Sequence, residues 1–161
     1  MHNVERPPDF LKQEIVMLDY VVSQMYLFQN YYLDAYGITG KQSKLLMFLI
    51  HHSDQAFTQK DLQRIFCLRG STVTSILKYL EKGGFIQRKT DALDARKKCI
   101  VLTAKGKAME PILLKLHEQQ QKLFLDGFTP EDRGQFIQFL HQLVHNADKW
   151  RIEFAKRLEL L

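Results

Sequence analysis

The chain has few of the residues that crosslink or interrupt a fold: two cysteines, four prolines and eight glycines among 161 residues. Two cysteines do not make a disulfide framework, so a hydrophobic core must hold the fold together. The longest apolar run, Leu45 to Ile50, is far shorter than the roughly 20 residues of a membrane-spanning helix. The start of the chain lacks the leader pattern of a basic segment followed by an apolar one. We therefore expect a cytoplasmic protein.

Patterns of catalytic or cofactor-binding residues are missing as well. There is no glycine-rich phosphate loop and no paired carboxylate motif, and Cys67 has no His or Asp beside it in sequence. His141 and His145 stand one helical turn apart, but no Cys or Glu cluster completes a metal-ligand set, and such a pair is usually solvated. We therefore expect no enzyme activity, no metal and no cofactor. Cys67 and Cys99 are expected to be small packed hydrophobic residues rather than redox sensors.

Positive charge is concentrated in the middle of the chain. Between Lys60 and Lys107 there are 12 Lys or Arg residues against four acidic ones, a net charge of +8, whereas the whole chain carries +5. The remainder is therefore mildly acidic. A basic central segment of this kind is typical of a surface that binds the phosphates of DNA. A membrane surface or an acidic protein would also attract it, but no basic amphipathic helix with exposed aromatic residues is found.

Two short amphipathic helices separated by a brief turn are predicted in this segment. Thr58 and Asp61 have the spacing of a capping box that begins the first helix. Its apolar stripe consists of Leu62, Ile65 and Phe66. The second helix has an apolar stripe of four residues, Val73, Ile76, Leu77 and Leu80. Its opposite face carries hydroxyl groups and one lysine, which can donate to phosphates or base edges: Ser71, Thr74, Ser75 and Lys78. The pair predicts a helix-turn-helix whose second helix lies in a DNA groove.

A β-hairpin is predicted directly after the helix pair. Gly83 and Gly84 can adopt the backbone conformation that closes a helix. A first strand is expected over residues 85–88 and a second from Lys98 to Thr103, whose side chain can cap the next helix. The chain order is therefore that of a helix followed by a β-hairpin.

The tip of this hairpin, residues 90–97, is polar and basic. A long side chain such as Arg96 suits the narrow minor groove of DNA, where the negative potential is greatest. Asp94 is a poor phosphate contact, so we expect it to shape the tip by pairing with Arg96 or Arg64. Lys97 adds a second cation beside Arg96.

Three runs in this region resemble the winged helix-turn-helix signature of MarR-type bacterial transcriptional regulators: residues 80–86 (LEKGGFI), 94–96 (DAR) and 101–106 (VLTAKG). The wing pattern D-x-R followed by L-T-x-x-G is fairly specific, and the length and helix order agree with it. The resemblance implies a mainly α fold with a small β-hairpin wing, in which a winged helix-turn-helix domain is flanked by long dimerisation helices.

The same resemblance implies a division of the chain. Residues 37–103 would form the DNA-binding domain, and residues 1–36 together with 104–161 the helical dimerisation region. The residues expected to contact DNA are Arg69, Ser71, Thr72, Thr74, Ser75, Lys78, Arg96 and Lys97. Arg69 stands where the family often has a small capping residue, so it is expected either to contact phosphate or to leave the cap to Ser71.

Long helices are predicted on both sides of the winged segment from the residues themselves. The chain from Asp9 to Tyr36 has no internal Gly or Pro, and Gly37 ends the helix. Thr129 and Pro130 begin a last helix, whose apolar stripe continues nearly to the terminus. Pro111 should kink or split the helix before it. The two ends have more apolar surface than one winged domain can cover, which predicts a homodimer.

Tyrosines crowd the first helix at positions 20, 26, 31, 32 and 36. Relatives in the family often bind small phenolic or lipophilic ligands beneath the winged domain, and Tyr26, Tyr32 and Tyr36 are the candidates for such an effector pocket. The alternative is that they are interface aromatic residues whose hydroxyls face water, which is the more common role.

Together these patterns predict a homodimeric, sequence-specific DNA-binding transcriptional regulator. We expect a repressor that a small-molecule effector releases from double-stranded DNA, with no membrane partner. It would read an inverted-repeat operator, with the recognition helix in the major groove and the wing in the minor groove. The alternative is a winged helix that serves as a protein-interaction module without sequence-specific DNA binding. Such a module would have an apolar or acidic recognition face.

Overall fold

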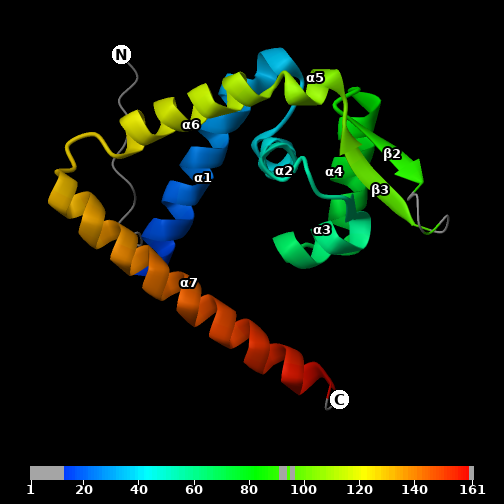
Figure 1. Ribbon diagram of the computed structural model, residues 1–161. Coiled ribbons are helices and arrows are strands. Elements are labelled where there is room, and N and C mark those ends of the chain that lie inside the picture. Colours follow the sequence, from blue (N-terminus) through cyan, green and yellow to red (C-terminus); the bar gives the residue numbers. More distant parts are fainter. Residues whose placement is uncertain (1–12, 91–93, 95–96, 160–161) are drawn as a thin grey trace. The chain divides into compact units, whose positions relative to one another are not determined.

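The computed structural model describes residues 13–90, 94 and 97–159, and the side chains as far as residue 153. It is mainly α-helical with a small antiparallel sheet, which confirms the predicted fold class (Figure 1). The chain divides into two units, residues 1–120 and 121–161, and each is described by itself. None of the helices in the described residues combines the length and the apolar character that a membrane crossing requires.

The elements follow one another in this order: α1 (Glu14–Leu33), the 3-10 turn η2 (Asp34–Tyr36), α2 (Gly40–His51), β1 (Phe57–Thr58), α3 (Gln59–Phe66), α4 (Gly70–Lys82), β2 (Ile86–Thr90), β3 (Lys98–Leu102), α5 (Ala104–Lys107), α6 (Glu110–Phe124) and α7 (Pro130–Glu159). The first unit holds the elements from α1 through most of α6. The second unit holds the end of α6 and α7.

The predicted stop of the first helical segment and start of the last helix are confirmed. The first helix begins later than predicted, because Gln13 has an extended backbone and is the N-cap of α1, and its last three predicted residues form the 3-10 turn η2. Gly37 closes the first helical segment with a left-handed φ of 66°, a conformation that costs glycine little because it has no Cβ. The helix expected around Pro111 is split into α5 and α6, and Pro111 lies in the first turn of α6, where its missing N–H costs nothing. At the start of α7, Asp132 Oδ2 accepts hydrogen bonds from the N–H and hydroxyl of Thr129 at 2.9 and 2.8 Å.

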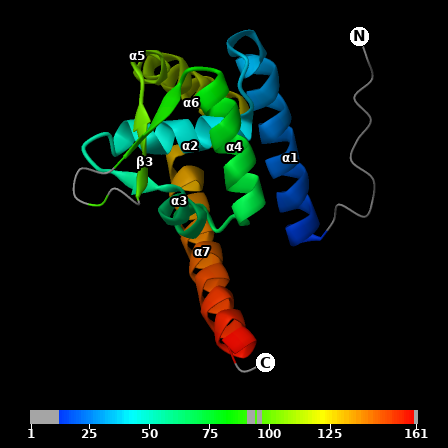
Figure 2. The ribbon, with the colours of Figure 1, turned by 90° about the vertical axis from the view of Figure 1, so that its right-hand side faces the viewer.

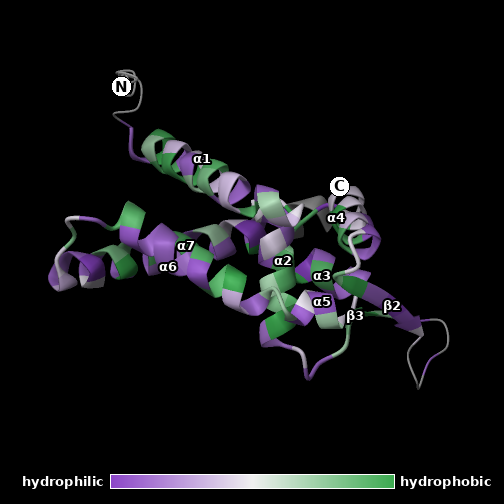
Figure 3. Ribbon diagram, turned by 90° about the horizontal axis from the view of Figure 1, so that it is seen from above, coloured by the Kyte–Doolittle hydropathy of each residue, from purple (hydrophilic) through white to green (hydrophobic). Residues whose placement is uncertain are grey.

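The sheet has three strands in the order β1-β3-β2, all antiparallel. The hairpin of β2 and β3 was predicted. The structure adds its register, in which Arg88 lies opposite Ile100. The edge strand β1 was not predicted, because two residues are too few to show a strand period. Ile86 of β2 is buried and the rest of the strand is exposed, so β2 is hydrophilic over most of its length (Figure 3).

The core of the first unit forms where the winged helices meet α2 and α6. All four predicted stripe residues of α4 are buried there, as are Leu113 and Leu116 of α6. Leu62 of α3 is fully buried, and Phe66 packs on Phe48 with ring centroids 5.3 Å apart. The prediction for Ile65 was wrong: its side chain is 41% exposed, because the two turns of α3 face the core through Leu62 and Phe66 only.

Cys67 is also placed differently from the prediction. Its backbone takes the left-handed conformation, with φ of 52°, and ends α3. The side chain is exposed, because this residue makes the turn toward α4 and points away from the core. Cys99, by contrast, is buried in β3 as expected.

A buried amide pair joins α1 to α6. Gln29 Nε2 donates to Gln120 Oε1 at 2.9 Å, and each side chain is only 4% exposed. In the described residues, Gln29 Oε1 and Gln120 Nε2 have no hydrogen-bond partner, although buried polar atoms usually have one. The first residue of α2, Gly40, packs so closely here that a Cβ would lie 2.5 Å from Gln29 Oε1. A side chain at position 40 would therefore force Gln29 to shift.

The L-T-x-x-G run has a clear structural role at the base of the wing. Thr103 Oγ1 donates to the carbonyl of Gly84 at 2.6 Å and accepts from the N–H of Gly106 at 3.0 Å, so it caps α5. Lys105 Nζ donates to the carbonyl of Gly83 at 2.8 Å and lies 4.4 Å from the centroid of the Phe85 ring. These contacts join the end of α4 to the hairpin, next to which α4 packs (Figures 1 and 2).

We expect Gly106→Ala to lower the free energy of unfolding by about 1–3 kcal/mol, because a Cβ at Gly106 would overlap the carbonyl oxygen of Phe85. Urea unfolding at a fixed protein concentration measures the change. The matched control is Gly134→Ala in α7, where a Cβ would meet nothing within 4 Å, and which should raise stability by about 0.5–1 kcal/mol. Equal effects of the two substitutions would contradict the role given to the close packing at Gly106.

Candidate nucleic-acid interface

The helix α4 presents the polar face that the sequence predicted. Its apolar stripe is buried in the core. Thr72 is half-buried, and the other predicted contacts on this helix are exposed: Ser71, Thr74, Ser75 and Lys78. Two to three turns of α4 therefore offer hydroxyl groups and a lysine on one side, where a helix in a major groove would meet bases and phosphates.

The N-terminus of α4 is shaped by Arg69. The helix begins at Gly70, and Arg69 occupies the N-cap position with an extended backbone and makes no capping hydrogen bond with its side chain. The cap is therefore not shifted to Ser71, which was one of the two expectations. Arg69 is exposed at the end of α4 that carries the positive end of the helix dipole.

Thr74 has contacts that the sequence did not reveal. Its hydroxyl donates to the carbonyl of Gly70 at 2.7 Å and accepts from Gln59 Nε2 at 2.8 Å. The hydroxyl proton is thus used inside the helix-turn-helix, and Thr74 joins α4 to the start of α3. Gln59 was not among the predicted site residues, because its partner lies 15 positions away and no local pattern marks it.

The wing contributes further positive charge. Lys97 Nζ lies 3.9 Å from Asp94 Oδ2, and the N–H of Lys97 donates to the carbonyl of Asp94 at 2.9 Å. Asp94 therefore pairs with its near neighbour in the tip, whereas Arg64, one of its expected partners, forms an ion pair with Asp61 at 3.3 Å. Arg96, the other expected partner and the predicted minor-groove residue, lies outside the described residues.

A second ion pair ties the wing to α4. Arg88 Nε of β2 lies 3.3 Å from Glu81 Oε2 in the last turn of α4. Both groups remain partly exposed, so the pair is a modest stabiliser rather than a strong one. Lys98 Nζ donates to Thr90 Oγ1 at 2.7 Å across the hairpin. Together these contacts hold the basic strands at a set position beside the recognition face.

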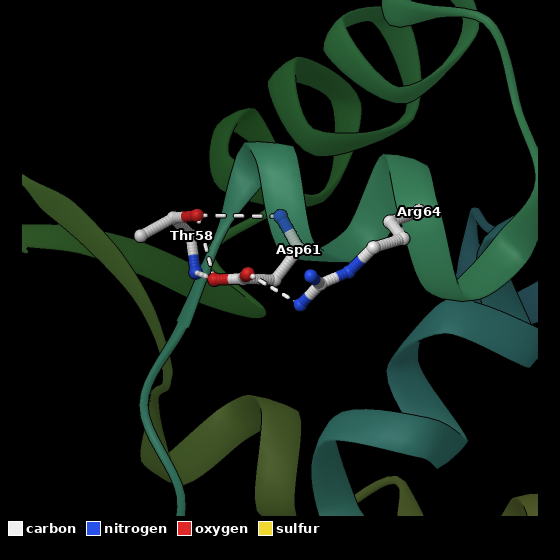
Figure 4. A network of polar contacts seen from close by, with 3 residues as sticks. All are labelled: Thr58, Asp61 and Arg64. Carbon is white, nitrogen blue, oxygen red and sulfur yellow. Dashed lines mark hydrogen bonds and ion pairs between the residues drawn. The ribbon is translucent and has the colours of Figure 1, made fainter.

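The first helix of the pair begins at a complete capping box (Figure 4). Asp61 Oδ2 accepts from the N–H and the hydroxyl of Thr58 at 2.9 and 2.7 Å, and Thr58 Oγ1 accepts from the N–H of Asp61 at 3.3 Å. Arg64 adds the ion pair on the other carboxylate oxygen. The hydrogen bonds from Thr58 are the main reason why the pKa of Asp61 is lowered, and the charges of Arg64 and Lys97 lower it further.

Comparisons with known proteins agree with this geometry. A family model described as MarR family matches residues 36–97. The transcriptional repressor YetL of Bacillus subtilis is 25% identical over 122 residues, which cover 76% of this chain and 73% of that protein. The transcriptional regulator SarZ of Staphylococcus epidermidis is 30% identical over 144 residues, which cover 87% of this chain and 93% of that protein.

The chain belongs to the MarR family. It is a transcriptional regulator, as its relatives are, and not an enzyme. Among solved structures, the crystal structure of MarR has a TM-score of 0.78 at 23% identity and covers 92% of this chain and 99% of that one. A structure of the S. aureus MepR–DNA complex has a TM-score of 0.77 at 23% identity, covering 83% and 98%. At this identity the two structures confirm the fold.

The three tyrosines predicted to line an effector pocket have different surroundings in this MarR-family protein. Tyr26 is half-buried, and its hydroxyl accepts from Lys44 Nζ at 2.9 Å. Tyr32 is half-buried against the core, with its ring centroid 6.3 Å from that of Phe28, and Tyr36 is 40% exposed. These contacts do not test the effector pocket, which stays a prediction.

The lowered pKa of Asp61 predicts a pH dependence of stability. Because the folded pKa lies below the ordinary value of 3.8, the charged cap stabilises the protein above about pH 4 and is lost as the pH falls through the folded pKa. Asp61→Asn should lower the free energy of unfolding by about 0.5–1 kcal/mol at pH 7, and the difference should shrink toward pH 3.

Urea unfolding of both proteins at pH 7, 5 and 3.5 measures this difference. Thr58→Ser serves as the control, because it keeps the hydroxyl oxygen and should stay close to the unchanged protein at each pH. A difference for Asp61→Asn that is constant from pH 7 to 3.5 would show that the charge of Asp61 does not contribute.

Proposed function

We propose that this MarR-family regulator is a homodimer that binds double-stranded DNA sequence-specifically in the cytoplasm. The observation that carries the proposal is the exposed hydroxyl and lysine face of α4, with a basic wing packed beside it. A net charge of +8 between Lys60 and Lys107 supports phosphate binding by this part of the chain. The similar S. aureus MepR structure is that of a DNA complex, which supports the same role here.

The proposal gives separate roles to α4 and the wing. Ser71, Thr72 and Ser75 would enter the major groove from α4, with Arg69 and Lys78 on phosphates. Thr74 would act mainly by holding α4 against Gln59, since its hydroxyl proton is already donated to Gly70. Arg96 would enter the minor groove from the wing tip, with Lys97 near the backbone.

Dimerisation is proposed through the flanking helices. Large apolar side chains are exposed on α1 and on α7, where a single chain would be expected to bury them. They include Ile15 (61% exposed) and Leu27 (63%) of α1, and Phe139 (65%), Val144 (61%) and Trp150 (63%) of α7. Residues 1–36 and 104–161 would then form the dimerisation region, and residues 37–103 the DNA-binding domain.

The sign of regulation and its control belong to the same proposal. The name of YetL, a transcriptional repressor, supports repression as the role of this chain. A small-molecule effector would release the repressor by changing the spacing of the two winged domains, since α1 carries the half-buried Tyr26 and Tyr32 beside α2. With Tyr36 these residues are the proposed effector contacts.

Selection from a random duplex pool tests the proposed function. We expect purified protein at near-physiological salt to enrich an inverted repeat whose half-sites are about one helical turn, roughly 10 bp, apart, because a two-fold dimer reads two equal half-sites. Sedimentation of the complex should give two chains per duplex. If no sequence is enriched and the protein binds all duplexes alike in a salt-sensitive way, the proposal is overturned and a protein-interaction module is favoured.

The two basic groups should behave differently on the selected operator. Arg96→Ala should weaken binding and reduce the preference for A·T pairs at the operator flanks, because it removes a minor-groove contact. Lys78→Ala should cost affinity evenly across sequences and lower the salt slope by about 1, because it removes a phosphate contact. Titration of operator variants at several salt concentrations measures both, and equal behaviour of the two variants would contradict these roles.

A further inference from the structure

A polar groove lies between the N-terminal ends of α2 and α4. Its polar lining is Thr39, Lys41, Gln42, Ser71, Thr72 and Ser75. Half of these residues come from the start of α2 and its cap, and were not expected to belong to the DNA-binding surface. The others belong to the recognition face of α4, so the groove continues that face toward α2.

The side chain of Gln42 has an unused donor in this groove. The residue is only 8% exposed, and its Oε1 accepts from the N–H of Thr39 at 2.9 Å, which completes the cap of α2. Among the described residues, no acceptor is found for its Nε2 group. Unlike Gln120 Nε2, this nitrogen is not fully buried, so an acceptor oxygen from outside the chain can reach its N–H groups.

The groove also has a positive electrostatic character. Lys41 is exposed, and no acidic residue is part of the described lining. Residues at the start of both helices line the groove, and the start of α4 has no side-chain cap. Hydroxyls, an amide and an ammonium group together suit a phosphate with several oxygens.

The position of the groove favours a phosphate of the DNA backbone. A helix with its side chains is about 10–12 Å across, and the major groove is about 12 Å wide, so a helix in that groove is close to the backbone on both sides. Ser71 and Ser75 line the groove and also belong to the recognition face of α4, so they would face a DNA bound to that helix. The backbone on the α2 side would then pass over Lys41 and Gln42.

We propose that the groove between α2 and α4 binds one phosphodiester of each half-site, with Lys41 as its cation and Gln42 Nε2 as a hydrogen-bond donor. The inference rests on the proposed DNA-binding function and adds α2 to the contact surface. The contact sets affinity and register and carries no base preference.

Operator binding by two variants tests the site. Lys41→Ala should raise Kd about three- to tenfold on all operator variants alike and lower the salt slope by about 1. Gln42→Glu keeps the oxygen that caps α2 but replaces the donor with a negative charge, so it should raise Kd by about tenfold or more with an unchanged thermal midpoint. Lys115→Ala, an exposed lysine of α6 outside the groove, is the control and should leave Kd unchanged.

Replacement of single operator phosphates by uncharged methylphosphonates locates the contact. Replacement of one particular phosphate in each half-site should weaken binding by the unchanged protein. The same replacement should not weaken binding by Lys41→Ala any further, because this variant has already lost the contact. Specific binding by the unchanged protein with the same Kd and salt slope for Lys41→Ala would overturn this inference and leave the proposed function standing. Absence of specific binding by the unchanged protein would overturn the function itself.

A free anion shares the chemistry of a backbone phosphate, so inorganic phosphate is titrated as a separate probe. One outcome is that inorganic phosphate shifts the backbone amide signals of residues 39–42 only when Lys41 is present, while operator binding is the same with and without Lys41. This outcome would assign the groove to small anions and overturn the proposal. Loss of operator affinity in Lys41→Ala, without saturable binding of inorganic phosphate, would support a contact made by the DNA backbone.

Discussion

The close packing of Gly106 against the carbonyl of Phe85 is the constraint on which the DNA-binding face depends. A side chain at position 106 would force the start of α5 away from β2. With Gly106 in place, Thr103 caps α5 and donates to Gly84, so the end of α4, both wing strands and α5 meet at one point. The recognition helix and the base of the wing therefore have a fixed relation to each other, which the proposed contact with two DNA grooves requires.

Short polar contacts add to the shared core in positioning the helix-turn-helix. Thr58, Asp61 and Arg64 fix the start of α3, and the hydrogen bond from Gln59 to Thr74 fixes α3 against α4. These side chains lie at or near the surface, so each contributes modestly and their value lies mainly in geometry. Because the Thr74 hydroxyl already donates to Gly70 and accepts from Gln59, it can form fewer hydrogen bonds to DNA than its exposure indicates.

In the part of the chain that the structure describes, the helices that flank the winged segment have exposed apolar side chains and buried polar atoms without hydrogen-bond partners. Apolar side chains on α1 and α7 are exposed, whereas the amide pair of Gln29 and Gln120 is buried with two polar atoms unpaired among the described residues. Exposed apolar surface favours association with another chain, and a half-satisfied buried pair weakens the packing of α1 against α6. Both properties fit the dimer and the effector control proposed above.

The sequence by itself determined the elements whose signals are local: the capping box at Thr58, the buried stripe of α4, the helix stop at Gly37, the split at Pro111 and the hairpin before Thr103. Helical period, capping and turn residues act within a few positions of the chain, so they can be read without the fold. Only the tertiary structure decided the strand β1, the exposure of Cys67 and Ile65, the bond between Gln59 and Thr74, and the groove between α2 and α4. Each of these depends on residues that are distant in sequence and meet only when the core brings their helices and strands together.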